Sequence, residues 1–151
     1  MTAAFRIRRA TLTDLPALLA LERSAFTTDH LSPRQYRQHL DSPTALVLAA
    51  VDGTGLLGKA VVFFRRESDL ARLYSIAVAG GARGRGIGEA LLTAIERAAH
   101  RRGARRMRLE VRQDNAAAMR LYERCGYARF AERPGYYEDG GDAWRYEKEL
   151  S

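Results

Sequence analysis

Apolar and polar residues alternate strictly along residues 106–112, where Met107, Leu109 and Val111 fall on one side. A period of two is typical of a strand with one covered face, so we predict a strand there. The other predicted strands follow shorter alternation or longer apolar runs, at residues 5–10, 44–51, 56–65, 70–78, 127–133 and 143–150. The Asp-Gly-Thr-Gly sequence at 52–55 separates two of these runs and favours a hairpin turn.

Four segments instead carry apolar residues at helical spacing. These predict helices over about residues 13–26, 33–40, 87–102 and 115–125. Thr13 is a candidate N-cap for the first helix, and Ser32 followed by Pro33 is a typical start for the second. Gly103 and Gly126 end the third and fourth. The element order β-α-α-β-β-β-α-β-α-β-β predicts an α/β fold, with a mixed, mainly antiparallel sheet flanked by about four helices.

The composition indicates one ordinary globular domain over residues 1–151, with 46% hydrophobic and 28% charged residues and no linker or repeat. No apolar run approaches the roughly 20 residues of a membrane-spanning helix, and charges interrupt the N-terminal 15 residues, where a signal peptide would be apolar. The single cysteine, Cys125, excludes an internal disulfide, and the three histidines show no metal-ligand spacing. We therefore expect a cytoplasmic protein without a metal site.

The net charge of +7 is unevenly distributed. Residues 83–112 contain nine arginines and three glutamates, whereas residues 138–149 contain five acids and two cations. A basic patch can bind nucleic acid, a membrane surface or a polyanion. However, arginines occur throughout the chain, and those from Arg97 to Arg105 lack interleaved aromatic residues. A nucleic-acid-binding module is therefore the weakest of the hypotheses, and neither nucleic acid nor membrane is an expected partner.

A glycine-rich turn joins a predicted strand to the third helix. It consists of Arg83, Gly84, Arg85, Gly86, Ile87 and Gly88. The start of a helix offers unpaired N–H groups and a positive dipole end to an anion, and glycines let the backbone approach closely. The Lys-Ser/Thr of a P-loop and the third glycine of a dinucleotide fingerprint are both missing. The alternative is a tight turn that needs glycine for its geometry alone.

This turn resembles the Gln/Arg-x-x-Gly-x-Gly/Ala signature of the GCN5-related N-acetyltransferases (GNAT). Further segments occur in the order and at the spacing of that family. They are Ile76-Ala77-Val78, Asn115-Ala116-Ala117-Ala118 and Leu121-Tyr122-Glu123. The resemblance covers nearly the whole chain and implies the GNAT fold, acetyl-CoA as cosubstrate, and direct attack of an amine on the thioester.

The resemblance also implies a cofactor site. The turn from Arg83 to Gly88 would hold the pyrophosphate through backbone N–H groups, with added charge from Arg83 and Arg85. Ile76, Ala77 and Val78, at the end of their strand, would pair with the pantetheine arm. Asn115 would add a side-chain hydrogen bond, although its position equally suits a helix cap.

Three residues are candidates for the chemistry. Glu110 corresponds to the general base. Since glutamate has an ordinary pKa of about 4.3, relay through ordered water is more plausible than direct abstraction. The alternative is a cross-strand or same-face ion pair with Arg108 or Arg112. Tyr122 corresponds to the acid that protonates the thiolate, or is a core tyrosine. Tyr74 corresponds to a tyrosine that assists the base, or is an aromatic on a buried strand.

A narrower resemblance points to protein N-terminal acetyltransferases, including the ribosomal-protein alanine acetyltransferases. It rests on the Tyr136-Tyr137 pair followed by Gly140-Gly141-Asp142-Ala143, a loop that closes over a peptide N-terminus in that branch. Tyr137 and Tyr136 are therefore candidate substrate contacts, as are His30 and Leu31 in the loop at 26–32, although that loop departs from the bacterial pattern. A protein or peptide N-terminus is the expected substrate. Lysine and small amines such as a polyamine, antibiotic or amino acid remain alternatives, and the sequence leaves the oligomeric state open.

Overall fold

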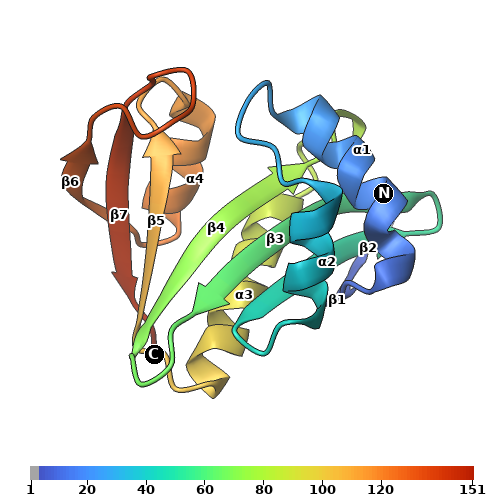
Figure 1. The fold of residues 1–151 in the computed structure, drawn as a ribbon, viewed down its shortest axis with the longest axis horizontal. Helices are drawn as coiled ribbons and strands as arrows, with labels where there is room; N and C mark the ends of the chain where they lie inside the picture. The colour runs from blue at the N-terminus through green and yellow to red at the C-terminus, as the bar shows by residue number, and fades with distance from the viewer. Residues whose placement is uncertain (1–3) are drawn as a thin grey trace.

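The computed structural model describes residues 4–151, and its core is a seven-stranded sheet (Figure 1). The strands are β1 (Arg6–Arg9), β2 (Ala45–Asp52), β3 (Gly55–Phe64), β4 (Leu70–Val78), β5 (Arg106–Arg112), β6 (Ala128–Arg133) and β7 (Ala143–Glu149). They lie in the order β1-β2-β3-β4-β5-β7-β6, and β4 with β5 is the parallel pair among antiparallel neighbours. The predicted mixed, mainly antiparallel sheet is confirmed.

Four α-helices cover the two faces of the sheet (Figure 1). They are α1 (Leu15–Ala25), α2 (Pro33–Asp41), α3 (Ile87–Arg101) and α4 (Ala116–Arg124). Leu18 of α1 and Tyr36 of α2 pack with Val61 of β3 in one hydrophobic cluster, while Leu91 of α3 and Tyr122 of α4 belong to a larger cluster on the other face. The sheet thus separates a face covered by α1 and α2 from a face covered by α3 and α4.

Local sequence signals account for these boundaries. At the start of α2, Ser32 accepts a hydrogen bond from the Gln35 N–H and the Gln35 side chain accepts one from the Ser32 N–H, which satisfies two otherwise unpaired donors. Pro33 occupies the first turn of the helix, where no N–H is needed. In β5, Met107, Leu109 and Val111 are all buried, as the alternation predicted. The first helix begins later than predicted, because residues 12–14 form a 3₁₀ turn before α1.

Among residues 4–151, no helix has both the length and the apolar character needed to cross a membrane.

Candidate functional site

The parallel strands β4 and β5 separate partway along their length. Residues 70–73 of β4 pair with 106–109 of β5, and this pairing does not continue. On its other side, β4 remains paired with β3 as far as Val78, with a register irregularity that leaves Tyr74 without a partner residue. The β5-facing edge of β4 is therefore unpaired from Ser75 to Val78 within the described part of the chain, and Figure 1 shows the two strands diverging. An unpaired strand edge can hydrogen-bond an extended ligand that carries amides, and Ile76, Ala77 and Val78 lie on it.

The glycine-rich turn lies beside this edge, at the start of α3. Gly86 is the N-cap residue, and both Gly84 (φ 82°) and Gly86 (φ 76°) adopt left-handed backbone angles that favour glycine. A Cβ at either position would meet no atom within 4 Å, so their backbone faces open space. No side chain caps α3, so its first N–H groups stay available to an anion. These features fit the predicted pyrophosphate cradle.

Two of the predicted cofactor residues make additional contacts. Arg85 forms an ion pair with Asp52 of the β2–β3 turn at 3.3 Å, so its charge is already engaged, whereas Arg83 is exposed. Asn115 accepts a hydrogen bond from the Ala118 N–H at 3.1 Å and so caps α4. Gly88 lies between α4 and β4, because a Cβ there would meet Leu121 at 3.4 Å and Val78 at 3.8 Å. Gly88 at the start of α3 therefore lies close to Val78 at the end of β4 and to Leu121 of α4.

Glu110 projects from β5 toward the opposite face of the sheet, the face of α1 and α2. Its side chain is only 5% exposed, and its carboxylate lies 3.1 Å from Arg72 of β4 and 4.0 Å from Arg145 of β7. The alternative of an ion pair between Glu110 and Arg108 or Arg112 is wrong in its partners. Arg108 pairs with Glu147 at 2.5 Å, and Arg112 pairs with Asp29 and Asp139. The cause is strand register, because Arg145 lies directly opposite Glu110.

Two loops meet beside Glu110. Tyr136 and Tyr137 of the β6–β7 loop form an edge-to-face pair with ring centroids 4.9 Å apart, and both are half-buried. Arg72 donates a hydrogen bond to the Tyr136 hydroxyl, while the guanidinium of Arg112 lies 4.1 Å from the Tyr137 ring centroid. Burial raises the pKa of both phenols, so they stay protonated at neutral pH.

Arg112 and Asp29 connect this loop to the loop between α1 and α2. Arg112 donates hydrogen bonds to Thr28 at 2.8 Å and Asp29 at 3.4 Å, and the Glu138 N–H donates to Asp29 at 3.3 Å. Asp29 has a φ of 58°, a conformation that aspartate tolerates better than most residues. The two loops therefore border the same end of the sheet, above the point where β4 and β5 separate.

Tyr122 and Tyr74 differ in their surroundings. Tyr122 is 5% exposed and packs edge-on against Tyr127 and Tyr146, and burial raises its pKa. Its hydroxyl has no hydrogen-bond partner among residues 4–151. Tyr74 is 38% exposed, so the alternative of a buried strand aromatic is wrong. It lies two residues after Arg72, on the same face of β4, and its ring contacts Phe63.

The two candidate substrate contacts in the α1–α2 loop, His30 and Leu31, differ in exposure. The side chain of His30 is exposed and folds back to the Phe26 carbonyl oxygen. Leu31 is 3% exposed and packs in the hydrophobic cluster beneath α1 and α2, so its side chain is directed away from the two-loop region. No cluster of metal-ligating side chains occurs within residues 4–151.

Residues 15–127 match the sequence family described as the acetyltransferase (GNAT) family. This match spans most of the chain. The protein belongs to the GNAT acetyltransferases.

Similar proteins include several N-acetyltransferases. An N-alpha-acetyltransferase of Sulfurisphaera tokodaii is 33% identical over 152 residues, covering 93% of this chain and 90% of its own. The mycothiol acetyltransferase of Beutenbergia cavernae is 32% identical over 115 residues, covering 76% of this chain but 38% of its own. The crystal structure of the ribosomal-protein-S18-alanine N-acetyltransferase from Escherichia coli superimposes with a TM-score of 0.86 at 29% identity, covering 98% of this chain and 95% of that one.

As a GNAT enzyme, the protein uses acetyl-CoA as its acetyl donor. The residues present fit this cosubstrate in two respects: the β4 edge is unpaired where an extended arm needs hydrogen bonds, and the uncapped α3 start offers N–H groups to phosphates.

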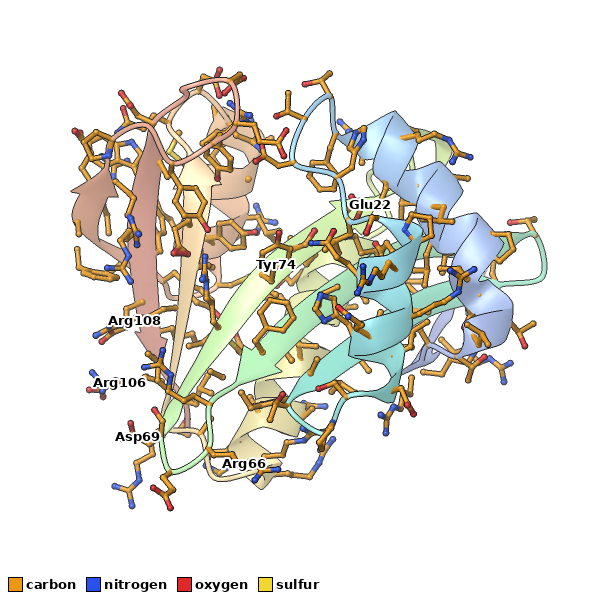
Figure 2. All side chains as sticks on the ribbon, viewed as in Figure 1. Glu22, Arg66, Asp69, Tyr74, Arg106 and Arg108 are labelled. Carbon is orange, nitrogen blue, oxygen red and sulfur yellow. The ribbon has the colours of Figure 1, made fainter. Side chains whose placement is uncertain are left out.

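A buried polar network near the site was not predicted from the sequence. Lys59 of β3 is completely buried and donates hydrogen bonds to Glu22 of α1 and, at 2.7 Å, to Ser75 of β4. Glu22 also accepts hydrogen bonds from the Tyr36 hydroxyl at 2.6 Å and the Leu31 N–H at 3.1 Å. The network therefore ties the α1–α2 loop to the bulged part of β4. Figure 2 shows Glu22 near the tip of β4 and Tyr74 further back along that strand.

Two sequence features signal this network in retrospect. Glu22 occupies the apolar stripe of its helix, and Lys59 is the lone charge in the apolar run at 56–64. A charge in such a position requires a buried partner.

Proposed function

We propose that this acetyltransferase acetylates the α-amine at the N-terminus of a protein or peptide. The observation that carries the proposal is the junction of the two loops through Arg112 and Asp29, which borders the Glu110 carboxylate with Tyr136 and Tyr137. This arrangement suits the N-terminal end of an extended peptide. The peptide backbone can hydrogen-bond to the tyrosine hydroxyls while its α-amine reaches the Glu110 carboxylate. The S. tokodaii relative is named as an N-alpha-acetyltransferase and the E. coli relative as a ribosomal-protein-S18-alanine N-acetyltransferase, which supports the same substrate class.

Acetyl-CoA supplies the activated acetyl group as a thioester. In the proposed mechanism, Ile76, Ala77 and Val78 bind the pantetheine arm through the open β4 edge, and the backbone at Arg83–Gly88, with Ile87 among its N–H donors, binds the pyrophosphate. Asn115 orients the start of α4 through its cap.

Glu110 accepts the proton that the substrate ammonium must lose before attack. An α-ammonium has an ordinary pKa of about 7.7–8.0, compared with about 10.4 for lysine, so its deprotonation requires less free energy. Arg72 and Arg145 beside Glu110 disfavour a further positive charge and lower the pKa of a bound ammonium. An ordered water between amine and carboxylate suits this weak base.

Tyr122 supplies the proton that converts the departing thiolate into a thiol. Its raised pKa keeps the phenol protonated, and its hydroxyl is not committed to another residue among those described. Tyr74, exposed on the same face as Glu110, is the proposed assistant of proton removal.

The B. cavernae relative, named as a mycothiol acetyltransferase, favours a second candidate function, the acetylation of a small amine. Mass spectrometry of a peptide panel incubated with acetyl-CoA separates the two. Each peptide is supplied with a free or blocked N-terminus and with an internal lysine or arginine. Acetylation confined to free N-termini supports the proposal, whereas turnover with small amines and unmodified peptides contradicts it.

A further inference from the structure

The face of the sheet that carries Glu110 has more positive than negative charge. Arg72 of β4, Arg108 of β5 and Arg145 of β7 all lie on it, and their acidic neighbours are Glu110 and Glu147. Glu147 is occupied by Arg108 at 2.5 Å and by Arg106 at 3.8 Å. Glu110 is consequently shared between Arg72 and Arg145, which leaves one guanidinium charge without a full carboxylate partner.

The same two arginines have unsatisfied hydrogen-bond donors. The Nε atoms of Arg72 and Arg145 are the two buried side-chain polar atoms without a hydrogen-bond partner among residues 4–151. Buried donors are normally satisfied, and those that are not call for an explanation. Both side chains remain reachable from solvent, with 42% of Arg72 and 27% of Arg145 exposed.

Neighbouring groups do not compensate this charge. Tyr136 accepts a hydrogen bond from Arg72 but is a neutral phenol, and a further cation, Arg133, lies 5.6 Å from its ring centroid. The ring of Phe130 lies 5.0 Å from the Arg145 guanidinium and holds it against the sheet without adding negative charge. A planar guanidinium supported in this way is suited to bidentate binding of a carboxylate.

We propose that Arg72 and Arg145 bind a carboxylate of the acceptor, so that the preferred substrates are peptides with Asp or Glu as their first or second residue. This inference rests on the proposed function, because it takes the amine beside Glu110 to be a peptide N-terminus. Both guanidinium groups lie within 4.0 Å of Glu110, so a carboxylate bound to them belongs to the residue that carries the amine or to the next one.

The test compares initial rates of acetylation for matched peptides that carry Asp, Asn, Ala or Lys at position 1 or position 2. For the wild-type protein, we expect kcat/KM to be at least tenfold higher for the Asp peptide than for the Asn peptide at one of these positions. The Lys peptide should have the lowest kcat/KM of the four. Arg145→Gln should reduce this ratio mainly by raising KM for the Asp peptide, and Arg145→Glu should reverse the order of Asp and Lys. Arg66→Gln, an equal charge change in the β3–β4 loop at the lower edge of the molecule in Figure 2, should keep the wild-type ratio.

Equal rates on Asp and Asn peptides by the wild-type protein would overturn this inference while leaving N-terminal acetylation intact. Failure to acetylate any peptide would contradict the proposed function instead. Free aspartate and glutamate form a separate arm of the panel: acetylation of these amino acids with no acidic-peptide preference would overturn the peptide assignment. Because the wild-type comparison needs no variant, it holds even if an Arg145 substitution fails to fold.

Discussion

Two carboxylates on the same side of the sheet, Glu22 and Glu110, are both almost inaccessible to solvent yet have different partners. Glu22 is 2% exposed and faces a completely buried lysine, a tyrosine hydroxyl and a backbone N–H. Both of its carboxylate oxygens therefore accept hydrogen bonds. The side chain of Glu110 is 5% exposed but faces two arginines that remain partly in solvent and retain unsatisfied donors.

The difference separates a structural ion pair from a reactive one. A closed network fixes the geometry of the elements that it joins, here α1, the α1–α2 loop, β3 and β4. An open network leaves hydrogen-bonding capacity for a ligand and a route for a proton. Substitutions in the Glu22 network should therefore affect mainly stability, whereas substitution of Glu110 should affect mainly catalysis.

The largest expected effect is on catalysis by Glu110→Gln. Loss of the proton acceptor should lower kcat by about 10²–10⁴-fold, the usual contribution of a general base. Steady-state kinetics with an N-terminal peptide measures this effect. The Tm should change little, because Arg72 and Arg145 still reach solvent. A large fall in Tm with kcat retained would show that Glu110 has a structural role and no catalytic one.

Lys59→Met should instead lower the stability of the fold. Removing one partner leaves the Glu22 charge buried, which costs about 3–5 kcal/mol of unfolding free energy. Denaturant unfolding measures the loss. The double variant Glu22→Leu/Lys59→Met provides the matched control, since replacing both charges with apolar residues should restore most of the stability. A double variant as unstable as the single one would show that the pair itself does not cause the effect.

Tyr122→Phe tests the proposed proton donor, which lies in the hydrophobic cluster on the opposite face of the sheet from Glu110. The substitution keeps the ring contacts with Tyr127 and Tyr146 and removes only a hydroxyl that has no partner in residues 4–151. We expect kcat to fall by about a hundredfold with unchanged Tm. A wild-type kcat in this variant would identify Tyr122 as a core residue only.

The smallest expected effect is a pH dependence of stability from Lys59. Complete burial lowers the pKa of Lys59, against the opposing attraction of Glu22. Between this lowered pKa and the ordinary value of 10.5, the unfolded chain holds a proton that the folded chain has released, so stability contributed by Lys59 rises with pH. The difference in unfolding free energy between wild type and Lys59→Met should therefore grow in favour of the wild type across the alkaline range. A difference that shrinks as pH rises would reverse the assigned direction.

The sequence predicted the elements well because their signals are local. The alternation in β5, the caps of α2 and the glycines before α3 each determine structure within a few residues. The same locality placed Glu110 on the face of β5 opposite Met107, Leu109 and Val111, and the proposed pantetheine-binding residues 76–78 at the end of β4.

The partners of both carboxylates depend on tertiary structure. Lys59 is 37 residues from Glu22, and their contact requires α1 to be docked on β3. Arg72 and Arg145 reach Glu110 from two other strands, whose registers the alternation alone does not specify. Likewise, the irregularity that leaves Tyr74 without a partner residue arises from the pairing of β3 with β4.

The most direct test of the account is to measure N-terminal acetylation by mass spectrometry with wild type, Glu110→Gln and Lys59→Met under conditions where all three are folded. The account predicts rapid α-amine acetylation by wild type, substantial acetylation by folded Lys59→Met and almost none by Glu110→Gln. Acetylation by Glu110→Gln at the wild-type rate would contradict it, because the open carboxylate would then have no part in removing the proton.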